Sequence, residues 1–88
     1  MTEINKEKLM LEILEYLKSR SKDYESTITN RDLANIELGE LHAIDALFYT
    51  VAVKGIHTTE SGEISDLFRK ESEESRQQIS NKFQELPL

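Results

Sequence analysis

His42, Asp45 and Tyr49 are the residues whose types and spacing come nearest to a chemical site. They follow one another at i, i+3 and i+7, which places their side chains along one strip of a helix. A carboxylate that orients an imidazole is what a general base or a metal-bound histidine requires. However, the spacing is common by chance, and no second histidine or cysteine nearby completes a metal-ligand set. We therefore expect a polar strip on a helix, with no cofactor and no metal, and keep a small hydrolase or metal enzyme as a minor alternative.

The other reactive side chains form no catalytic or nucleotide motif. His57 and Glu60 repeat the i, i+3 spacing within a connecting segment, where their geometry is not fixed. No Gly-x-Ser-x-Gly elbow is present. The glycines at 39, 55 and 62 are too scattered to cradle a phosphate. The sequence thus predicts a protein that is not an enzyme.

The elements that must position these residues are helices. Between Lys6 and Ser19 apolar residues recur every three or four positions, with charged residues opposite, which predicts an amphipathic helix. Its C-terminal cations Lys18, Arg20 and Lys22 suit the negative end of the helix dipole. Residues 21–29 are polar and end in poor helix formers, so we expect a loop there, or a short extended piece.

The middle of the chain reads as two helices. Thr29 followed by Asp32 resembles a capping box, so a short helix from Asn30 to Leu38 should bury Leu33 and Ile36 and stop at Gly39. A second helix is expected from Glu40 to Lys54. Because it is apolar over nearly its whole circumference, we expect it to be the central buried helix, ended by Gly55.

Residues 29–56, together with the Thr- and Ser-rich segment that follows, resemble a helix-turn-helix with a small wing, as in winged-helix regulators. DNA binding is disfavoured, because the would-be recognition helix contains Glu40 and Asp45 and no Lys or Arg before Lys54. The basic residues that could contact DNA phosphates would be limited to Lys18, Arg20, Lys22 and Arg31.

A final helix is expected from Gly62 to Leu86, with Ile64, Leu67, Phe68, Ile79, Phe83 and Leu86 on one face. Residues 69–78 interrupt that face with ten residues of which none is apolar. Such a helix spans roughly 35 Å, longer than helices of 10 to 15 residues can cover. We expect the chain either to fold back within residues 69–78, or to project and pack its end on a second copy or a foreign partner.

Composition limits the classes of function. The 88 residues suffice for one helical domain, residues 1–88, with one core. A net charge of −6 repels phosphate backbones and anionic lipid, so nucleic acid is an unlikely partner and membrane binding is not expected. The chain has no cysteine, no apolar stretch of membrane-spanning length and a polar start, which suggests a cytoplasmic protein.

These observations predict an all-α fold, a compact bundle of three to four helices whose middle is helix-turn-helix-like and whose C-terminal helix is long. The predicted function is a small acidic protein-binding module, such as an adaptor, inhibitor or immunity-type factor of bacterial or phage origin. The alternative is a transcriptional regulator with a degenerate winged-helix domain. The partner is expected to be another protein or a second copy in a homodimer. The candidate contact residues are the acids of the polar segment and the apolar end of the last helix: Glu71, Glu73, Glu74, Phe83 and Leu86.

Overall fold

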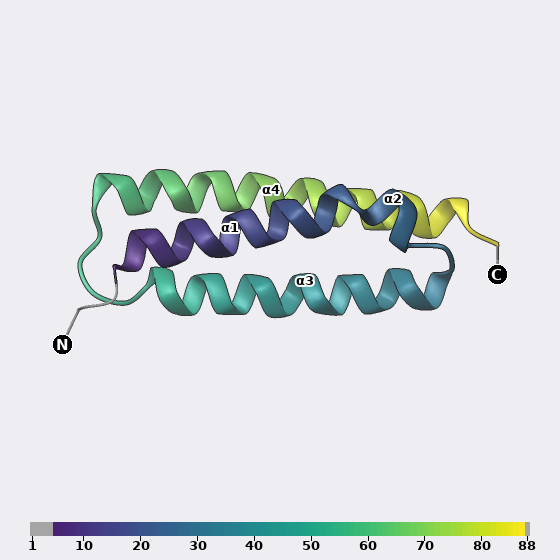
Figure 1. The fold of residues 1–88 in the computed structure, drawn as a ribbon, viewed down its shortest axis with the longest axis horizontal. Coiled ribbons are helices and arrows are strands. Elements are labelled where there is room, and N and C mark those ends of the chain that lie inside the picture. The colour runs from purple at the N-terminus through teal and green to yellow at the C-terminus, as the bar shows by residue number, and fades with distance from the viewer. Residues whose placement is uncertain (1–4, 88) are drawn as a thin grey trace.

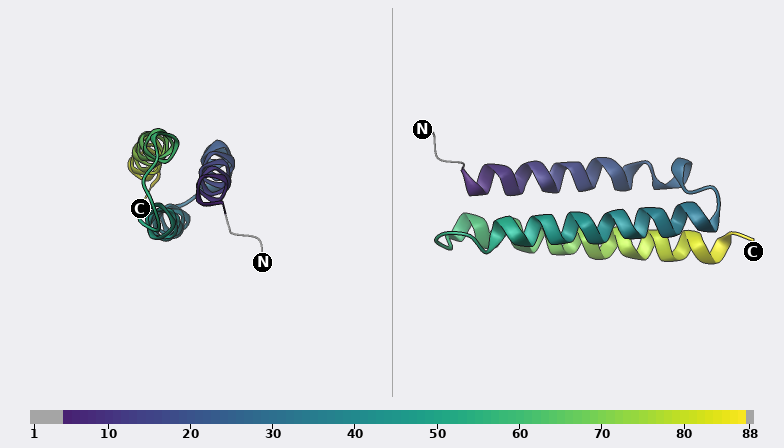
Figure 2. Two further views of the ribbon diagram at one scale, coloured as in Figure 1. Left: turned by 90° about the vertical axis from the view of Figure 1, so that its left-hand side faces the viewer. Right: turned by 90° about the horizontal axis from the view of Figure 1, so that it is seen from below.

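The computed structural model describes residues 5–87, which form three long helices lying side by side and one short helix. The long helices are α1 (Lys6–Lys22), α3 (Arg31–Ala52) and α4 (Thr59–Glu85), and α2 (Tyr24–Thr27) is a single turn after α1. Successive long helices run in opposite directions, so α1 and α4 are parallel (Figure 1). Viewed along the bundle, the three long helices occupy the corners of a triangle (Figure 2). The predicted all-α bundle with a long C-terminal helix is confirmed.

One continuous core runs along the axis of the bundle. Each long helix contributes a stripe of buried side chains at three- and four-residue spacing, as the amphipathic patterns predicted. Phe48 of α3 and Phe68 of α4 stack within it, with ring centroids 3.8 Å apart and planes 4° apart. The buried apolar residues are Met10, Ile13, Leu14, Leu17, Tyr24, Ile28, Ala34, Leu41, Ile44, Phe48, Ala52, Ile64, Phe68 and Ile79.

The segment after the first helix is more helical than expected. The helix α1 extends to Lys22, and α2 follows at once, so only residues 28–30 are extended. Asn30 is the N-cap of α3, with its side-chain oxygen accepting from the Leu33 backbone N–H at 2.8 Å. The predicted cap at Thr29 was wrong by one residue, because either side chain could cap and the backbone turn decides which one does.

Gly39 does not stop the middle helix. The helix α3 is continuous through Gly39, so the predicted pair of helices with a turn between them was wrong. A glycine in a helix interior costs only about 1 kcal/mol relative to alanine, which is less than the packing lost if the helix broke there. Gly55, the other glycine expected to be left-handed, does have a φ of 69°.

The winged-helix resemblance loses its structural basis for the same reason. With α3 continuous, no helix-turn-helix is present, and residues 5–87 contain no strand that could form a wing. The predicted central burial of the second helix was also wrong. The helix α3 is one of three equivalent helices, and its side away from α1 and α4 is exposed, including Ile36, which had been expected in the core.

The long helix α4 neither folds back nor projects. It begins at Thr59, capped by Thr58, and continues through residues 69–78. The two predicted alternatives both failed, because α3 is longer than the expected neighbours and covers α4 nearly to its end. Ser72 and Ser75 are the buried residues of the polar segment, so the inward stripe continues through small hydroxyl side chains to Ile79.

No helix within residues 5–87 is long and apolar enough to cross a membrane.

Candidate functional site

The predicted strip of His42, Asp45 and Tyr49 does not converge into a site. The Asp45 carboxylate turns toward α4, where Oδ1 accepts from Ser72 Oγ and Oδ2 from the Arg76 guanidinium, both at 2.8 Å. Tyr49 places its ring edge-on to Phe68, with centroids 5.9 Å apart. His42 is exposed and has no contact with Asp45 among the hydrogen bonds of the described residues. Asp45 therefore joins α3 to α4 and does not orient the imidazole.

A cluster of polar side chains joins α1 to α3. Arg20 donates to Glu37 at 2.6 Å and to Glu40 at 3.0 Å, and Tyr16 donates its hydroxyl to Glu40 at 2.9 Å. Bonding to Glu37 raises the pKa of Arg20 above its already high value. The same kind of bond to Glu40 raises the pKa of Tyr16. All four groups are held by one another, so this cluster fixes how α1 sits against α3 and presents no free reactive group.

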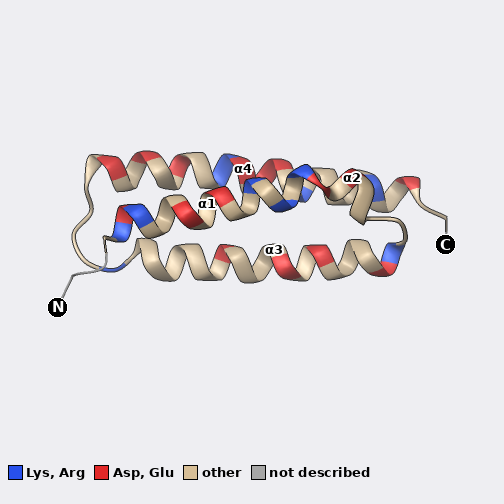
Figure 3. Ribbon diagram, viewed as in Figure 1, with Lys and Arg blue, Asp and Glu red and all other residues tan. Residues whose placement is uncertain are grey.

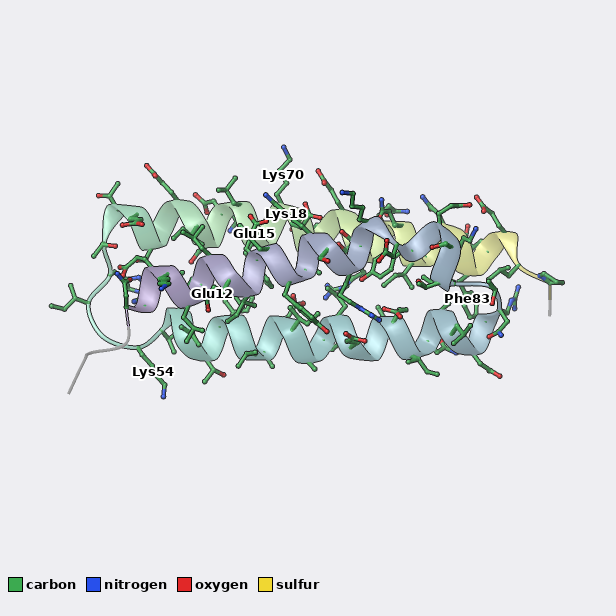
Figure 4. The ribbon with its side chains drawn as sticks, in the orientation of Figure 1. Glu12, Glu15, Lys18, Lys54, Lys70 and Phe83 are labelled. Atoms are coloured by element: carbon green, nitrogen blue, oxygen red, sulfur yellow. The ribbon has the colours of Figure 1, made fainter. Side chains whose placement is uncertain are left out.

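Two hollows lie beside α3. One, of about 470 Å³, opens between α3 and α4, with an apolar floor and a polar rim. Arg76 lies on that rim but is already paired with Asp45. The other, of about 400 Å³, is the groove between α1 and α3, and its lining is mostly apolar. This groove is lined by Leu9, Glu12, Ile13, Tyr16, Glu40, Ala43, Ile44 and Leu47; Figure 4 shows Glu12 on the side of α1 that faces α3.

The groove continues onto the exposed side of α3, which we call the α3 outer face and define as Ile36, Ala43, Leu47, Thr50 and Val53. These five residues are all exposed. The exposed fractions are 61% for Ile36, 55% for Leu47 and 70% for Val53. Ile56, in the connection that follows α3, is 85% exposed. Contiguous exposed apolar side chains of this kind mark interaction surfaces on water-exposed proteins.

The α3 outer face is also free of charge. Between Asp32 and Lys54 the acidic residues of α3 are Glu37, Glu40 and Asp45, and each turns to an arginine of α1 or α4. Figure 3 shows the contrast: the part of α3 that follows Asp45 carries no charged residue, whereas charges alternate along α1 and α4. The most apolar part of the surface and the charged part therefore lie on different helices.

The predicted contact residues do not form one surface. Glu73 and Glu74 are exposed on α4, whereas Glu71 is half-buried and accepts from Ser21 Oγ at 3.0 Å. Phe83 packs against the core with the Arg31 guanidinium 4.6 Å from its ring centroid. Leu86 is half-buried, and its carbonyl accepts from Arg31 at 3.2 Å. Phe83 and Leu86 thus close the end of the core, and a binding role for the exposed acids stays a prediction.

His57 and Glu60 are both exposed at the turn into α4. Within residues 5–87 no three His, Asp or Glu side chains are grouped so that they could hold a metal ion.

Sequence reasoning missed the α3 outer face, although a signal was present. Ile36, Ala43, Leu47 and Thr50 are spaced by seven, four and three residues, which is the spacing of one helix face. The buried stripe of α3 has the same period, so periodicity alone could not tell which of the two apolar stripes faces the core.

A scan against protein-family models and searches of the curated proteins and of the solved structures found no match to this chain.

Proposed function

We propose that this chain is a small acidic protein-binding module without enzymatic activity, and that the α3 outer face is its binding surface. The observation that carries the proposal is the exposure of Ile36, Leu47 and Val53 on a helix whose acids between Asp32 and Lys54 are all paired with arginines of α1 or α4. Covering these side chains with a partner removes apolar area from water, at roughly 25 cal/mol per Å². The acidic remainder of the surface keeps the unbound chain from associating indiscriminately.

The alternative of a DNA-binding regulator has lost its supporting argument. Of the four basic residues on which it relied, Lys18 is paired with Glu15, Arg20 with two glutamates, and Arg31 stacks on Phe83. This leaves Lys22. We therefore expect the protein to flow through a heparin column at low salt, because too few free cations remain to meet a row of phosphates.

The proposal is tested by photo-crosslinking from one defined position. Since the chain has no cysteine, Leu47→Cys creates a unique site for a benzophenone maleimide, and Lys70→Cys on α4 is the matched control. Lys70 projects away from the other helices (Figure 4). In lysate of the source cells, we expect light to join position 47 to a defined polypeptide, in competition with unlabelled wild-type chain but not with the Leu47→Glu variant.

Adducts of equal yield from positions 47 and 70, or no adduct from position 47 in lysate or in the purified protein, would contradict the proposed surface.

A further inference from the structure

The properties of the α3 outer face also indicate which partner it takes. We propose that this face pairs with the same face of a second copy of the chain, with the two α3 helices antiparallel about a two-fold axis near Ala46. The inference rests on the proposed function, because it assumes that the α3 outer face is a binding surface. It names the occupant of that surface.

The first argument is electrostatic. Each copy carries a net charge of −6, so most ways of bringing two copies together are repulsive. The α3 outer face is the exception, because Glu37 and Glu40 are paired with Arg20, Asp45 is paired with Arg76, and residues 46–53 include no charged side chain. Two copies can meet there without bringing carboxylates into direct opposition.

The second argument is the placement of the exposed apolar residues. Ile36 lies near the N-terminal end of α3 and Ile56 follows its C-terminal end, so an antiparallel pair with its axis near Ala46 brings Ile36 toward Ile56 of the partner subunit. A single two-fold operation therefore covers both ends of the α3 outer face as well as its centre. Beside Leu47, the exposed side chains around the axis include the small Ala43, Ala46 and Thr50. Two helices can approach there at the 8 to 10 Å separation usual for packed helices.

The third argument is the position of two charged residues, Glu40 and Lys54, that border the α3 outer face. Glu40 lies on the edge of the groove between α1 and α3, and Lys54 follows the C-cap of α3, pointing away from the bundle (Figure 4). The two residues lie on opposite sides of the proposed axis along the chain. Antiparallel pairing brings Lys54 toward Glu40 of the partner subunit twice, whereas parallel pairing would oppose Glu40 to Glu40 and Lys54 to Lys54.

The size of the α3 outer face predicts the strength of the dimer. From Ile36 to Val53 the helix rises about 25 Å, and a helix is about 10 Å wide. A contact of this area lies at the low end for specific interfaces, below about 1,200 Å² in total. We therefore expect a concentration-dependent dimer with a dissociation constant in the micromolar range.

Sedimentation equilibrium of the purified wild-type chain at increasing concentration tests the association. Leu47→Glu should raise the dissociation constant by about 100-fold, since it places two like charges in the centre of an apolar contact. Lys54→Glu should raise it by about tenfold, and Lys70→Glu, which changes the net charge by the same amount on another helix, should leave it within about twofold. Far-UV circular dichroism checks that each variant keeps its helices.

Cysteine crosslinking then tests the register. Oxidation should join Ala46→Cys to its own copy, because the two positions meet at the axis. The two copies of Ile36→Cys would be about 30 Å apart and should not join, but a mixture of the Ile36→Cys and Ile56→Cys chains should. Self-joining of Ile36→Cys without joining of the mixture would overturn the antiparallel arrangement.

The outcomes separate this inference from the proposed function. A purified chain that stays monomeric to about millimolar concentration, while position 47 still crosslinks to a different protein in lysate, would overturn the second copy as partner and leave the binding face standing. A dimer that Leu47→Glu does not weaken would overturn both. A dimer lost with Leu47→Glu, weakened by Lys54→Glu and joined at Ala46→Cys supports both.

Discussion

Ser72 and Ser75 are both buried on α4, but only one of them has a partner. The Ser72 hydroxyl donates to Asp45 at 2.8 Å, which helps hold α4 against α3. The Ser75 hydroxyl is buried and has no hydrogen-bond partner. Burying an unpaired hydroxyl costs roughly 1 to 3 kcal/mol, so the two serines should respond in opposite directions to the same substitution.

We therefore expect Ser75→Ala to raise the free energy of unfolding by about 1 kcal/mol, because it removes the unpaired hydroxyl and improves helix propensity. Ser72→Ala is the matched control and should lower the free energy of unfolding by about 1 kcal/mol, because it leaves the Asp45 carboxylate with one bond fewer. Urea unfolding followed by circular dichroism measures both. Destabilisation by Ser75→Ala would show that the hydroxyl does have a partner.

Tyr24 makes the stability of the bundle depend on pH at the alkaline end. Burial, and secondarily the nearby charge of Glu37, raises the pKa of Tyr24 to about 12 from a usual 10. Between pH 10 and pH 12 the unfolded chain therefore releases a proton that the folded chain keeps. Unfolding becomes easier as the pH rises through this window, and below pH 10 the effect is absent.

The variant Tyr24→Phe should not show this dependence. From pH 9 to pH 12 we expect the wild type to lose about 2 kcal/mol more of its free energy of unfolding than Tyr24→Phe loses, since two pKa units correspond to about 2.7 kcal/mol at full effect. Taking the difference between the two proteins cancels the titration of the lysines. Parallel pH profiles would mean that Tyr24 ionises in the folded state as freely as in water.

A substitution at Gly39 tests whether α3 is one continuous helix. A glycine inside an exposed stretch of helix should be improved by alanine, whereas a left-handed glycine at a helix stop should not tolerate it. Nothing lies within 4 Å of a Cβ added at Gly39, so no clash opposes the change.

We expect Gly39→Ala to raise the free energy of unfolding by about 0.5 to 1 kcal/mol. Gly55→Ala is the control and should lower it by a similar amount, because Gly55 has a φ of 69°. Thermal unfolding at a protein concentration below the dissociation constant of the proposed dimer isolates the effect on the helix. A loss of stability from Gly39→Ala would instead support a break at that position.

The bundle as a whole is narrow, with extents of 51 × 24 × 17 Å. Three helices around one axis leave each with a wide outer side, and in α1 and α4 that side is charged. In the part of α3 that follows Asp45 it is not, which is the basis for proposing association through that helix. Association that stabilises the folded state makes the unfolding temperature depend on protein concentration.

We expect the midpoint of thermal unfolding of the wild type to rise by several degrees between about 5 µM and 500 µM protein, since mass action favours the folded dimer. The midpoint of Leu47→Glu should not change over the same range. Calorimetry at matched concentrations measures both, with Lys70→Glu as the variant that should follow the wild type. A midpoint independent of concentration in all three would argue against self-association.

Local patterns determined the helical content. The stripe from Leu9 to Leu17 predicted α1 closely, and the apolar groups at each end of α4 predicted a long last helix, because helix periodicity is a property of neighbouring residues. The left-handed Gly55 after α3 was predicted for the same reason, since such a glycine is a local feature, although the helix itself ends earlier, at Ala52. These parts of the fold needed no knowledge of what packs against what.

The tertiary structure decided the rest. Whether Gly39 ends a helix depends on what the broken helix would lose in packing, and whether Ser72 and Ser75 can be buried depends on what α3 presents to them. Which of the two apolar stripes of α3 faces outward is likewise set by where α1 and α4 lie. The α3 outer face, and with it the proposed binding surface, follows from the arrangement of three helices, because burial is a relation between elements and not a property of one stretch of sequence.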